Sequence, residues 1–429
     1  MSETAQPEVL SCPLHEVDTF DPQFLQQPHP FYRRLREEAP VFRDPKTGVV
    51  SVATYEHVME ALTKPRIFSN AFGAQLRAGS AEAQIDPEEA EVLKDSVALV
   101  DTMLTADPPD HTRYRKLAGS AFTFKKVMAM SEYVEGVVNE LIDAFAEAGE
   151  CEFKSQFGNL LPMYVICDAL GFSREGRADY ARWSTAFVLQ LSGMADKEQR
   201  IWCARQVNEA HQYFLQVCEA RRAEPREDIV SDLVHADLEL DGEEAPRKLT
   251  DGELCSILQQ ILVAGNETTA HTLTTGLYYL LSHPEQMELL RADDSLIENF
   301  VEESLRMLTP TNNMWRVATE DTELGGVAIS KGDMLLLRFG SANRDDDTFA
   351  EGDRFDITRD NARKHLAFGG GVHLCLGQQL ARKEMATAFR IILKRLQNIR
   401  LADPDQTFMY VPSILLRGVV ELKIRFDAA

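Results

Sequence analysis

The residues best suited to chemistry surround a single cysteine near the C-terminal end of the sequence. Residues 368–377 (FGGGVHLCLG) place three glycines before Cys375, and a long helical pattern follows. A cysteine just before a helix feels the positive end of the helix dipole and nearby backbone N–H groups, which favour the thiolate. A thiolate suits iron, and Gly371 and Gly377 let the backbone turn sharply and approach a flat, bulky ligand. The alternative is a glycine-rich turn around one buried structural cysteine. A phosphate-binding loop fits less well because no GK[ST] follows.

A second group of reactive side chains interrupts a long apolar stretch. Residues 264–269 (AGNETT) place an acid, Glu267, and the hydroxyl of Thr268 between apolar runs. Ala264 and Gly265 are small enough for a flat group to lie against the backbone. The Thr268 hydroxyl can bond to the carbonyl four residues back, which bends or opens a helix. A solvent-facing polar turn is the alternative.

Two further pairs combine charged or polar side chains at helical spacing. Glu303 and Arg306 are three residues apart and therefore share one helix face. The plain alternative is a surface ion pair, worth under about 1 kcal/mol. His111 and Arg115 are four apart in residues 107–115 (DPPDHTRYR), where proline and aspartate suit the first turn of a helix. For this second pair an ordinary helix surface is the alternative.

The elements that must position these residues are mostly helices. A capping-box pattern at residues 250–253 (TDGE) predicts a helix of roughly 32 residues, about 48 Å long, that carries the AGNETT segment. A second such pattern, at residues 295–298 (SLIE), predicts a helix that stops before Pro310. After about residue 311, β-branched residues and turn signals predict short strands. One more helix should follow Cys375, and strands should return at about 411–426. The predicted fold is mainly α with a small β-rich portion.

The composition is that of an acidic globular protein. The chain has 429 residues, and 45 basic against 68 acidic side chains give a net charge of −23, which disfavours binding to nucleic acid or anionic lipid. The seven cysteines form no CxxC pair, which argues against a zinc ribbon. No secretory signal and no membrane-spanning apolar run is recognisable, so we expect a cytoplasmic protein. Because we find no repeat or linker, we expect one domain over residues 1–429.

The cysteine loop resembles that of a known family. The spacing of Phe368, Gly371, Cys375 and Gly377 is similar to the haem-binding loop of cytochromes P-450, the haem-thiolate monooxygenases, and other family motifs follow in order along essentially the whole chain. The resemblance implies that Cys375 is the axial ligand of the iron in haem b, iron protoporphyrin IX. A thiolate ligand pushes electron density toward iron and favours O–O cleavage.

The resemblance also implies roles for the other motifs. Thr268 would position dioxygen and an ordered water, and Glu267 would assist proton delivery, a form of general acid catalysis. Glu303 and Arg306 would form a structural network with Arg354, although this chain has Gly352 where the family usually has proline. Cations would bind the two haem propionates, Arg316 and His373 among them. The cofactor-binding residues implied in this way are His111, Arg115, Ala264, Gly265, Arg316, Phe368, His373, Cys375 and Gly377.

A local excess of basic residues suggests a partner. Residues 111–126 (HTRYRKLAGSAFTFKK) contain no acid, and Lys364, Arg382 and Lys383 flank the cysteine loop. In the family both segments lie on the cysteine side of the haem, so we expect a docking patch for an acidic electron donor such as a ferredoxin. A solvated helix face is the alternative. No flavin or nucleotide motif is present, so a separate reductase must supply the electrons.

The substrate is less clearly specified than the cofactor. Family resemblance assigns the access region to residues 70–105 and 180–200. Leu104, Val263, Met314 and Leu415 suggest an apolar cavity, although each could be a core residue. A terpenoid, a steroid or a fatty-acid-like molecule fits equally well. The expected reaction is hydroxylation with O2. A peroxide-driven peroxygenase and a haem-based sensor are the competing functions, and the intact acid–threonine pair disfavours both.

Overall fold

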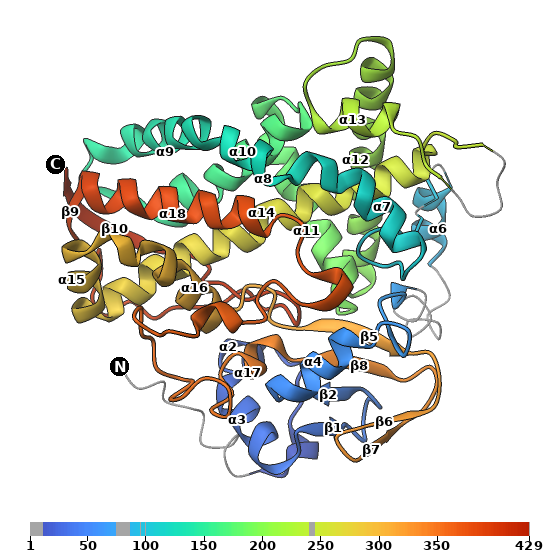
Figure 1. Ribbon diagram of the computed structural model, residues 1–429, viewed down its shortest axis with the longest axis horizontal. Coiled ribbons are helices and arrows are strands. Elements are labelled where there is room, and N and C mark those ends of the chain that lie inside the picture. Colours follow the sequence, from blue (N-terminus) through green and yellow to red (C-terminus); the bar gives the residue numbers. More distant parts are fainter. Residues whose placement is uncertain (1–11, 74–85, 95, 99, 240–244, 429) are drawn as a thin grey trace. The chain divides into compact units, whose positions relative to one another are not determined.

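The computed structural model describes residues 12–73, 86–94, 96–98, 100–239 and 245–428 (Figure 1). The contacts divide the chain into two compact units. Unit 1 comprises Met1–Phe68, Ala129–Pro162 and Thr268–Ala429, and unit 2 comprises Ser69–Met128 and Met163–Glu267. Helices dominate and the strands are short, which confirms the predicted mainly α fold with a small β-rich portion. The helices α10 (Leu160–Leu170) and α14 (Asp251–Ser282) each contribute several residues to both units.

Unit 1 holds all the sheets. Its helices are α2 (Pro22–Gln26), α3 (His29–Glu38), α4 (Tyr55–Thr63), α9 (Ser131–Ala146), α15 (Pro284–Ala292), α16 (Ile297–Leu308), α17 (Phe339–Ala342) and α18 (Gln378–Arg395). Its strands are β1 (Val41–Arg43), β2 (Val50–Val52), β3 (Phe68–Ser69, whose last residue belongs to unit 2), β4 (Glu150–Glu152), β5 (Met314–Ala318), β6 (Thr322–Leu324), β7 (Val327–Ile329), β8 (Met334–Leu337), β9 (Leu396–Leu401) and β10 (Lys423–Ala428). Short turns of helix occur at η5 (Asp294–Leu296), η6 (Ala362–Lys364) and η7 (Gly371–His373).

The largest sheet has five strands in the order β1-β2-β8-β5-β3. Strands β2 and β8 pair in parallel, with Val50 opposite Leu335 and Val52 opposite Leu337, whereas β8 and β5 are antiparallel. All four of these side chains are fully buried, as expected for the centre of a sheet that is covered on both faces. Figure 1 shows this sheet in blue and orange with α4 beside it.

Two smaller sheets complete the β-rich portion of unit 1. Strand β10 lies between β4 and β9, and β6 pairs with β7. The β6–β7 turn consists of Gly325 and Gly326, with φ of 57° and 76°. A two-residue hairpin turn needs this left-handed backbone, and glycine adopts it without strain. The hairpin expected from the turn signals after residue 311 is therefore confirmed.

Unit 2 is helical. Its helices are α6 (Pro87–Leu93), α7 (Asp110–Gly119), α8 (Phe124–Ala129, whose last residue belongs to unit 1), α11 (Arg177–Ser192), α12 (Lys197–Ala223) and α13 (Ile229–His235). An aromatic cluster of Phe172, Tyr180, Trp183, Tyr213 and Phe214 packs α11 against α12. Among the described residues no helix is long and apolar enough to cross a membrane.

The two capping-box predictions had different outcomes. At the start of α14 the Thr250 N–H donates to Glu253 Oε2 (2.7 Å), and the Glu253 N–H donates to Thr250 Oγ1 (3.3 Å), as predicted. The prediction for Ser295 was wrong. Asp293 accepts from the Ser295 N–H and begins the turn η5, and α16 starts only at Ile297 without a side-chain cap. Asp293, two residues before Ser295, caps the free backbone N–H group at the start of this turn instead.

Candidate functional site

The cysteine loop of unit 1 is built by backbone bonds and glycine conformation. The Cys375 N–H donates to the Phe368 carbonyl (2.9 Å), which closes the loop just before α18. Gly369 and Gly371 have φ of 68° and 62°, in the left-handed region. A Cβ on Gly371 would lie 2.3 Å from the carbonyl oxygen of Leu62, so only glycine fits there.

Gly377 differs from the expectation. Its φ is −84°, so it makes no sharp turn and serves as the N-terminal cap of α18. No atom lies within 4 Å of the position a Cβ would take. Glycine at 377 therefore leaves space beside the cysteine loop, which agrees with the predicted close approach of a bulky ligand but not with the predicted turn.

The seven thiols fall into two groups. Five are buried, and burial raises their pKa to about 11 for Cys203 and to about 12 for the others, Cys151, Cys167, Cys218 and Cys255. Cys375 and Cys12 are partly exposed. Cys375 also precedes an 18-residue helix, whose N-terminal dipole favours a thiolate. Its neighbours Val372 and Leu374 expose 39% and 38% of their surface, so exposed apolar side chains lie next to it in the sequence.

Helix α14 exposes one face at its centre. Ala264 is exposed, and Val263, Glu267 and Thr268 are partly exposed, whereas Leu262 and the side chains at 266, 269 and 270 are buried. Positions four apart lie on the same helix face, so the acid and the threonine share an accessible stripe with Ala264.

Close packing between two helices explains the glycine at position 265. A Cβ there would lie 3.1 Å from side-chain atoms of Ile166 on α10. The glycine therefore allows α10 and α14 to approach closely within unit 2. Back-bonding of the type expected for Thr268 is present one turn later, where Thr272 Oγ1 donates to the Thr268 carbonyl (2.9 Å).

Helix α7 of unit 2 carries His111 and Arg115. It begins at Asp110, because Asp107 instead holds the chain at residues 69–70 by accepting from Ser69 Oγ and from the Asn70 N–H (3.0 Å). His111 is buried, and burial followed by the charge of Arg115 lowers its pKa. His111 is therefore neutral at pH 7, and its ring can offer a hydrogen bond rather than a charge.

Glu303 and Arg306 form a fully buried ion pair rather than a surface pair. Both side chains are 0% exposed, and the guanidinium makes two 2.7 Å bonds to the carboxylate. The other Arg306 donors bond to the carbonyls of Asn343, Gly352 and Arg354.

The predicted third arginine was wrong. The Arg354 side chain points to Glu351 and Asp356, and it is Arg359 whose Nε lies 3.3 Å from Glu303. Arg354 joins the network only through its carbonyl oxygen. Gly352 is required by space, since a Cβ would lie 2.3 Å from the Arg344 carbonyl.

The remaining predicted residues of unit 1 lie on β5 and η7. Arg316 on β5 is 3% exposed, and its Nη1 donates to the Trp315 carbonyl (2.7 Å). His373 on η7 is partly exposed. Of the suggested substrate contacts, Met314, Leu104 and Val263 are partly exposed and Leu415 is buried. Part of the suggested access region, residues 74–85, 95 and 99, lies outside the described residues.

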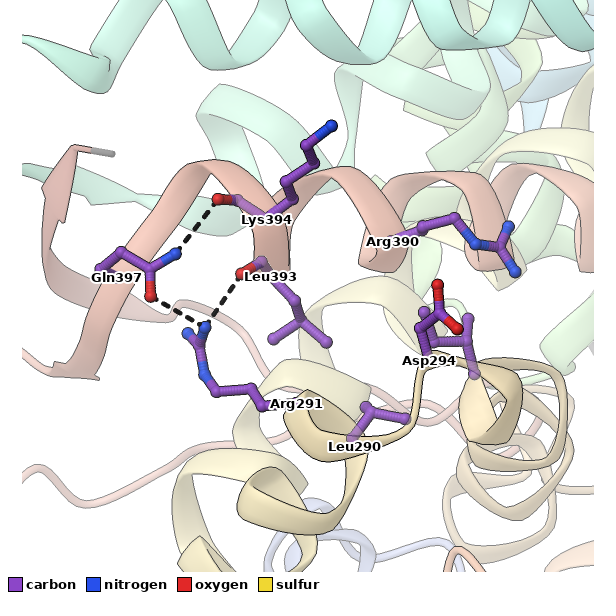
Figure 2. A pocket seen from close by; sticks show the side chains of 8 residues that line it. Leu290, Arg291, Asp294, Arg390, Leu393, Lys394 and Gln397 are labelled. Carbon is purple, nitrogen blue, oxygen red and sulfur yellow. Dashed lines mark hydrogen bonds between the residues drawn. The ribbon is translucent and has the colours of Figure 1, made fainter.

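A surface hollow elsewhere in unit 1 is a different feature. It has a volume of about 410 Å³, and it is lined by Leu290, Arg291, Asp294, Ile297, Arg390, Leu393, Lys394 and Gln397. Figure 2 shows Arg291 turned toward the end of α18, where it donates to the Leu393 carbonyl (2.9 Å) and to Gln397 Oε1 (3.2 Å). The hollow contains no predicted site residue. Arg291 caps carbonyls at the end of α18, which is a structural role.

Comparisons with known proteins agree with the motifs. The cytochrome P450 family model matches residues 179–416. A steroid C26-monooxygenase from Mycobacterium tuberculosis is 37% identical over 413 residues, which cover 96% of this chain and 97% of the relative. This chain belongs to the cytochrome P450 family. Its activity is that of a P450 monooxygenase, and its cofactor is haem b.

Two further comparisons support the same assignment. The 6-deoxyerythronolide B hydroxylase of Saccharopolyspora erythraea is 38% identical over 325 residues, 76% of this chain and 78% of the relative. The crystal structure of the myxobacterial cytochrome P450 CYP267B1 in complex with myristic acid aligns with a TM-score of 0.83 at 32% identity, covering 95% of this chain and 98% of that one.

The residues of this P450 fit haem. The partly exposed Cys375 provides a soft ligand, and the space beside Gly377 and the exposed apolar side chains of Val372 and Leu374 suit a bulky apolar group. His111, Arg115, Arg316 and His373 can donate hydrogen bonds to carboxylates. Sequence reasoning missed Arg359 and the contacts of Arg382, because neither follows from local spacing.

Proposed function

We propose that this P450 hydroxylates an apolar small molecule of the terpenoid, steroid or fatty-acid-like class, using O2 and electrons from a separate ferredoxin and reductase. The observation that carries the proposal is the accessible stripe of α14 with Ala264, Glu267 and Thr268. The names of the steroid relative and of the myristic acid complex are in keeping with an apolar substrate. We also infer that residues 1–429 act as one P450 domain in the cytoplasm.

Each predicted residue has a proposed role in this reaction. Bound to Cys375, haem supplies the chemistry that activates O2 for insertion into a C–H bond. The Thr268 hydroxyl positions O2 and one water, and Glu267 passes protons to that water. His111, Arg115, Arg316 and His373 donate to the propionates. Ala264, Gly265, Phe368 and Gly377 line the faces of the cofactor.

The electron donor is proposed to be acidic, although fewer of the basic side chains are available to it than the sequence suggested. Three of the cations are already paired: Arg113 with Asp110 (2.5 Å), Lys126 with Asp232 (3.1 Å) and Arg382 with Glu302 (2.6 Å). Among the described residues, Lys116 and Lys125 in unit 2 and Lys364 and Lys383 in unit 1 form no salt bridge. Phe124 and Met128, which flank Lys125, expose 69% and 44% of their surface. Exposed apolar and basic side chains together favour a protein partner.

Thr268→Ala tests the catalytic proposal. The variant should retain haem and substrate binding, but most reducing equivalents should leave as hydrogen peroxide, because water and O2 are no longer held in place. Coupling is measured as product formed per NAD(P)H consumed. The adjacent Thr269→Ala is the control, since Thr269 is buried outside the stripe. Unchanged coupling in Thr268→Ala would remove the role of that hydroxyl.

Three assays address the partner, the oxidant and the substrate. Electron transfer from a ferredoxin should fall steeply between low and high salt, since exposed charges are screened within about 10 Å at 0.1 M. A rate that does not change with salt would exclude electrostatic docking.

Comparing the product formed with O2 and reductase with the product formed with peroxide alone separates a monooxygenase from a peroxygenase. A compound panel screened for displacement of the haem-bound water, seen as a spin-state shift, identifies the substrate class.

A further inference from the structure

A cluster of charged and polar side chains around a buried carboxylate contacts the cysteine loop of unit 1. Glu302 on α16 is 1% exposed. Arg382 on α18 donates to both of its oxygens, from Nε (2.6 Å) and from Nη2 (3.1 Å). His365 Nε2 lies 3.0 Å from Glu302 Oε2. Because the Ala367 N–H donates to His365 Nδ1 (3.1 Å), the ring proton resides on Nε2 and is donated to the carboxylate. All four bonds are mutually compatible.

The carboxylate at the centre of the cluster is ionised. Burial alone would raise the pKa of Glu302, but the bonds from His365 and Arg382 outweigh burial and lower the pKa to about 2. A buried anion that holds two donors fixes their geometry, because releasing either one leaves a charge without compensation. Glu302 is therefore a rigid anchor for the Arg382 guanidinium.

Arg382 connects this anchor to the cysteine loop. Its Cζ lies 4.5 Å from the centroid of the Phe368 ring, and the His365 ring lies 5.6 Å from the same centroid. The carbonyl of Phe368 accepts the Cys375 N–H (2.9 Å). Arg382 Nη1 also donates to Gln378 Oε1 (2.7 Å) in the first turn of α18. One guanidinium thus contacts both ends of the segment that presents the sulfur.

A planar guanidinium is needed for this set of contacts. Two parallel bonds to a carboxylate, a third bond in the same plane and stacking on an aromatic face match the arginine fork. A lysine ammonium keeps the charge but provides neither the fork nor the flat face. The neighbouring cations differ from Arg382. Arg363 is 71% exposed and 3.7 Å from Glu302, and Lys383 forms no salt bridge among the described residues.

We propose that Arg382 is a positioning residue for Cys375: anchored on Glu302, it holds Phe368 and the start of α18 and so sets the conformation of the cysteine loop. The sequence suggested instead that Arg382 is a docking cation. The proposal rests on the role of Cys375 as the haem ligand. It requires that the effect of Arg382 be visible without any electron donor present.

The experiment compares Arg382→Lys, Arg382→Gln and the matched control Lys383→Gln, each as the full-length haem-loaded protein. Samples are reduced with dithionite and treated with carbon monoxide, so no partner protein takes part. Both Arg382 variants should lose the red-shifted absorption of the sulfur-ligated form roughly tenfold faster than wild type, the effect of one lost charge-assisted hydrogen bond. Their haem reduction potentials should also change, whereas Lys383→Gln should match wild type in both readouts.

The outcomes separate this proposal from its alternatives. If Arg382→Lys retains the wild-type spectrum and potential, while Arg382→Gln slows only electron transfer from ferredoxin, Arg382 is a docking cation and the proposal is overturned. If the wild-type protein itself lacks the sulfur-ligated absorption, it is the role of Cys375 that fails. Should the Arg382 variants not retain haem, Glu302→Gln decides. An altered spectrum supports the proposal, and a wild-type spectrum and potential overturn it.

Discussion

Two sets of ion pairs connect helices in this molecule, one fully buried in unit 1 and one partly to fully exposed in unit 2. In unit 1, Glu303 and Arg306 are both 0% exposed, and the guanidinium bonds to three backbone carbonyls as well as to the acid. In unit 2, α6 has no buried side chain and lies against α12. The pairs between these helices are Lys197–Asp86 (2.7 Å), Arg200–Glu89 (3.3 Å) and Arg205–Glu88 (2.6 Å).

The two sets of ion pairs differ in the solvent exposure of their side chains rather than in their N–O distances. Breaking a buried pair leaves an uncompensated charge and typically costs about 3–5 kcal/mol. An exposed pair contributes about 0–1 kcal/mol and is screened by salt. Unit 1 therefore gains a fixed frame around its cysteine loop. Helix α6 is held by contacts that can open individually, which suits the access region that the sequence assigned to residues 70–105.

The largest effect is expected from breaking the buried pair. Arg306→Ala should lower the free energy of unfolding by about 3–5 kcal/mol, because Glu303 would remain buried without its main partner. Thermal unfolding of the haem-loaded protein measures the change. Arg354→Gln is the matched control, because the Arg354 side chain is 57% exposed and only its carbonyl joins the network. If both variants lose the same stability, the distinction between buried and exposed arginines does not hold.

A smaller effect on stability is expected at low pH, where the buried Glu302 becomes protonated. The pKa of Glu302 is lowered from 4.5 to about 2. A depressed pKa means that this carboxylate contributes its full stability above about pH 4.5 and loses it as pH falls toward 2. Glu302→Gln should therefore flatten the acid-induced loss of stability in that window. Asp86→Asn should flatten it less, because the Asp86 carboxylate, whose pKa is also lowered by Lys197 and the Glu88 N–H, pairs with an exposed lysine. Melting curves from pH 7 to pH 2.5 give the comparison, and equal slopes for the two variants would contradict it.

The smallest effect is expected at α6. Replacing Lys197, Arg200 and Arg205 together by glutamine should leave global stability within about 1–2 kcal/mol, since none of these pairs is fully buried. Amide hydrogen exchange in α6 should accelerate several-fold, and wild type should show the same acceleration at high salt. Arg222→Gln is the control, because Arg222 on the same helix pairs with Glu219 and Asp251 instead. If the amide exchange rate in α6 changes with neither salt nor the triple substitution, α6 is held by contacts other than these ion pairs.

Several local patterns in the sequence were confirmed, although the capping box predicted at residues 295–298 was not. The capping box at residues 250–253 and the glycine-rich loop before Cys375 depend on neighbours in the chain, and both have the expected backbone form. The turn at Gly325 and Gly326 belongs to the same class. Short-range hydrogen bonds and φ angles follow from the residues themselves.

What escaped prediction depends on contacts between distant segments. Whether Arg354 or Arg359 meets Glu303 is decided by which side chain faces inward after a turn. Arg382 looks like a surface cation in the sequence, yet it lies 80 residues from the buried carboxylate that it holds. The packing of Gly265 against Ile166 on another helix was likewise not visible in the sequence. Charge and size are visible in a sequence, but burial is not.

The uneven exposure of the thiols has a practical consequence. Five of the seven are inaccessible and remain protonated near neutrality, while Cys12 and Cys375 can be reached from solvent. After a Cys12→Ser exchange, a maleimide dye would find essentially one reactive position. Labelling yield would then report, by mass spectrometry and without any assay of turnover, what fraction of a preparation has its porphyrin in place.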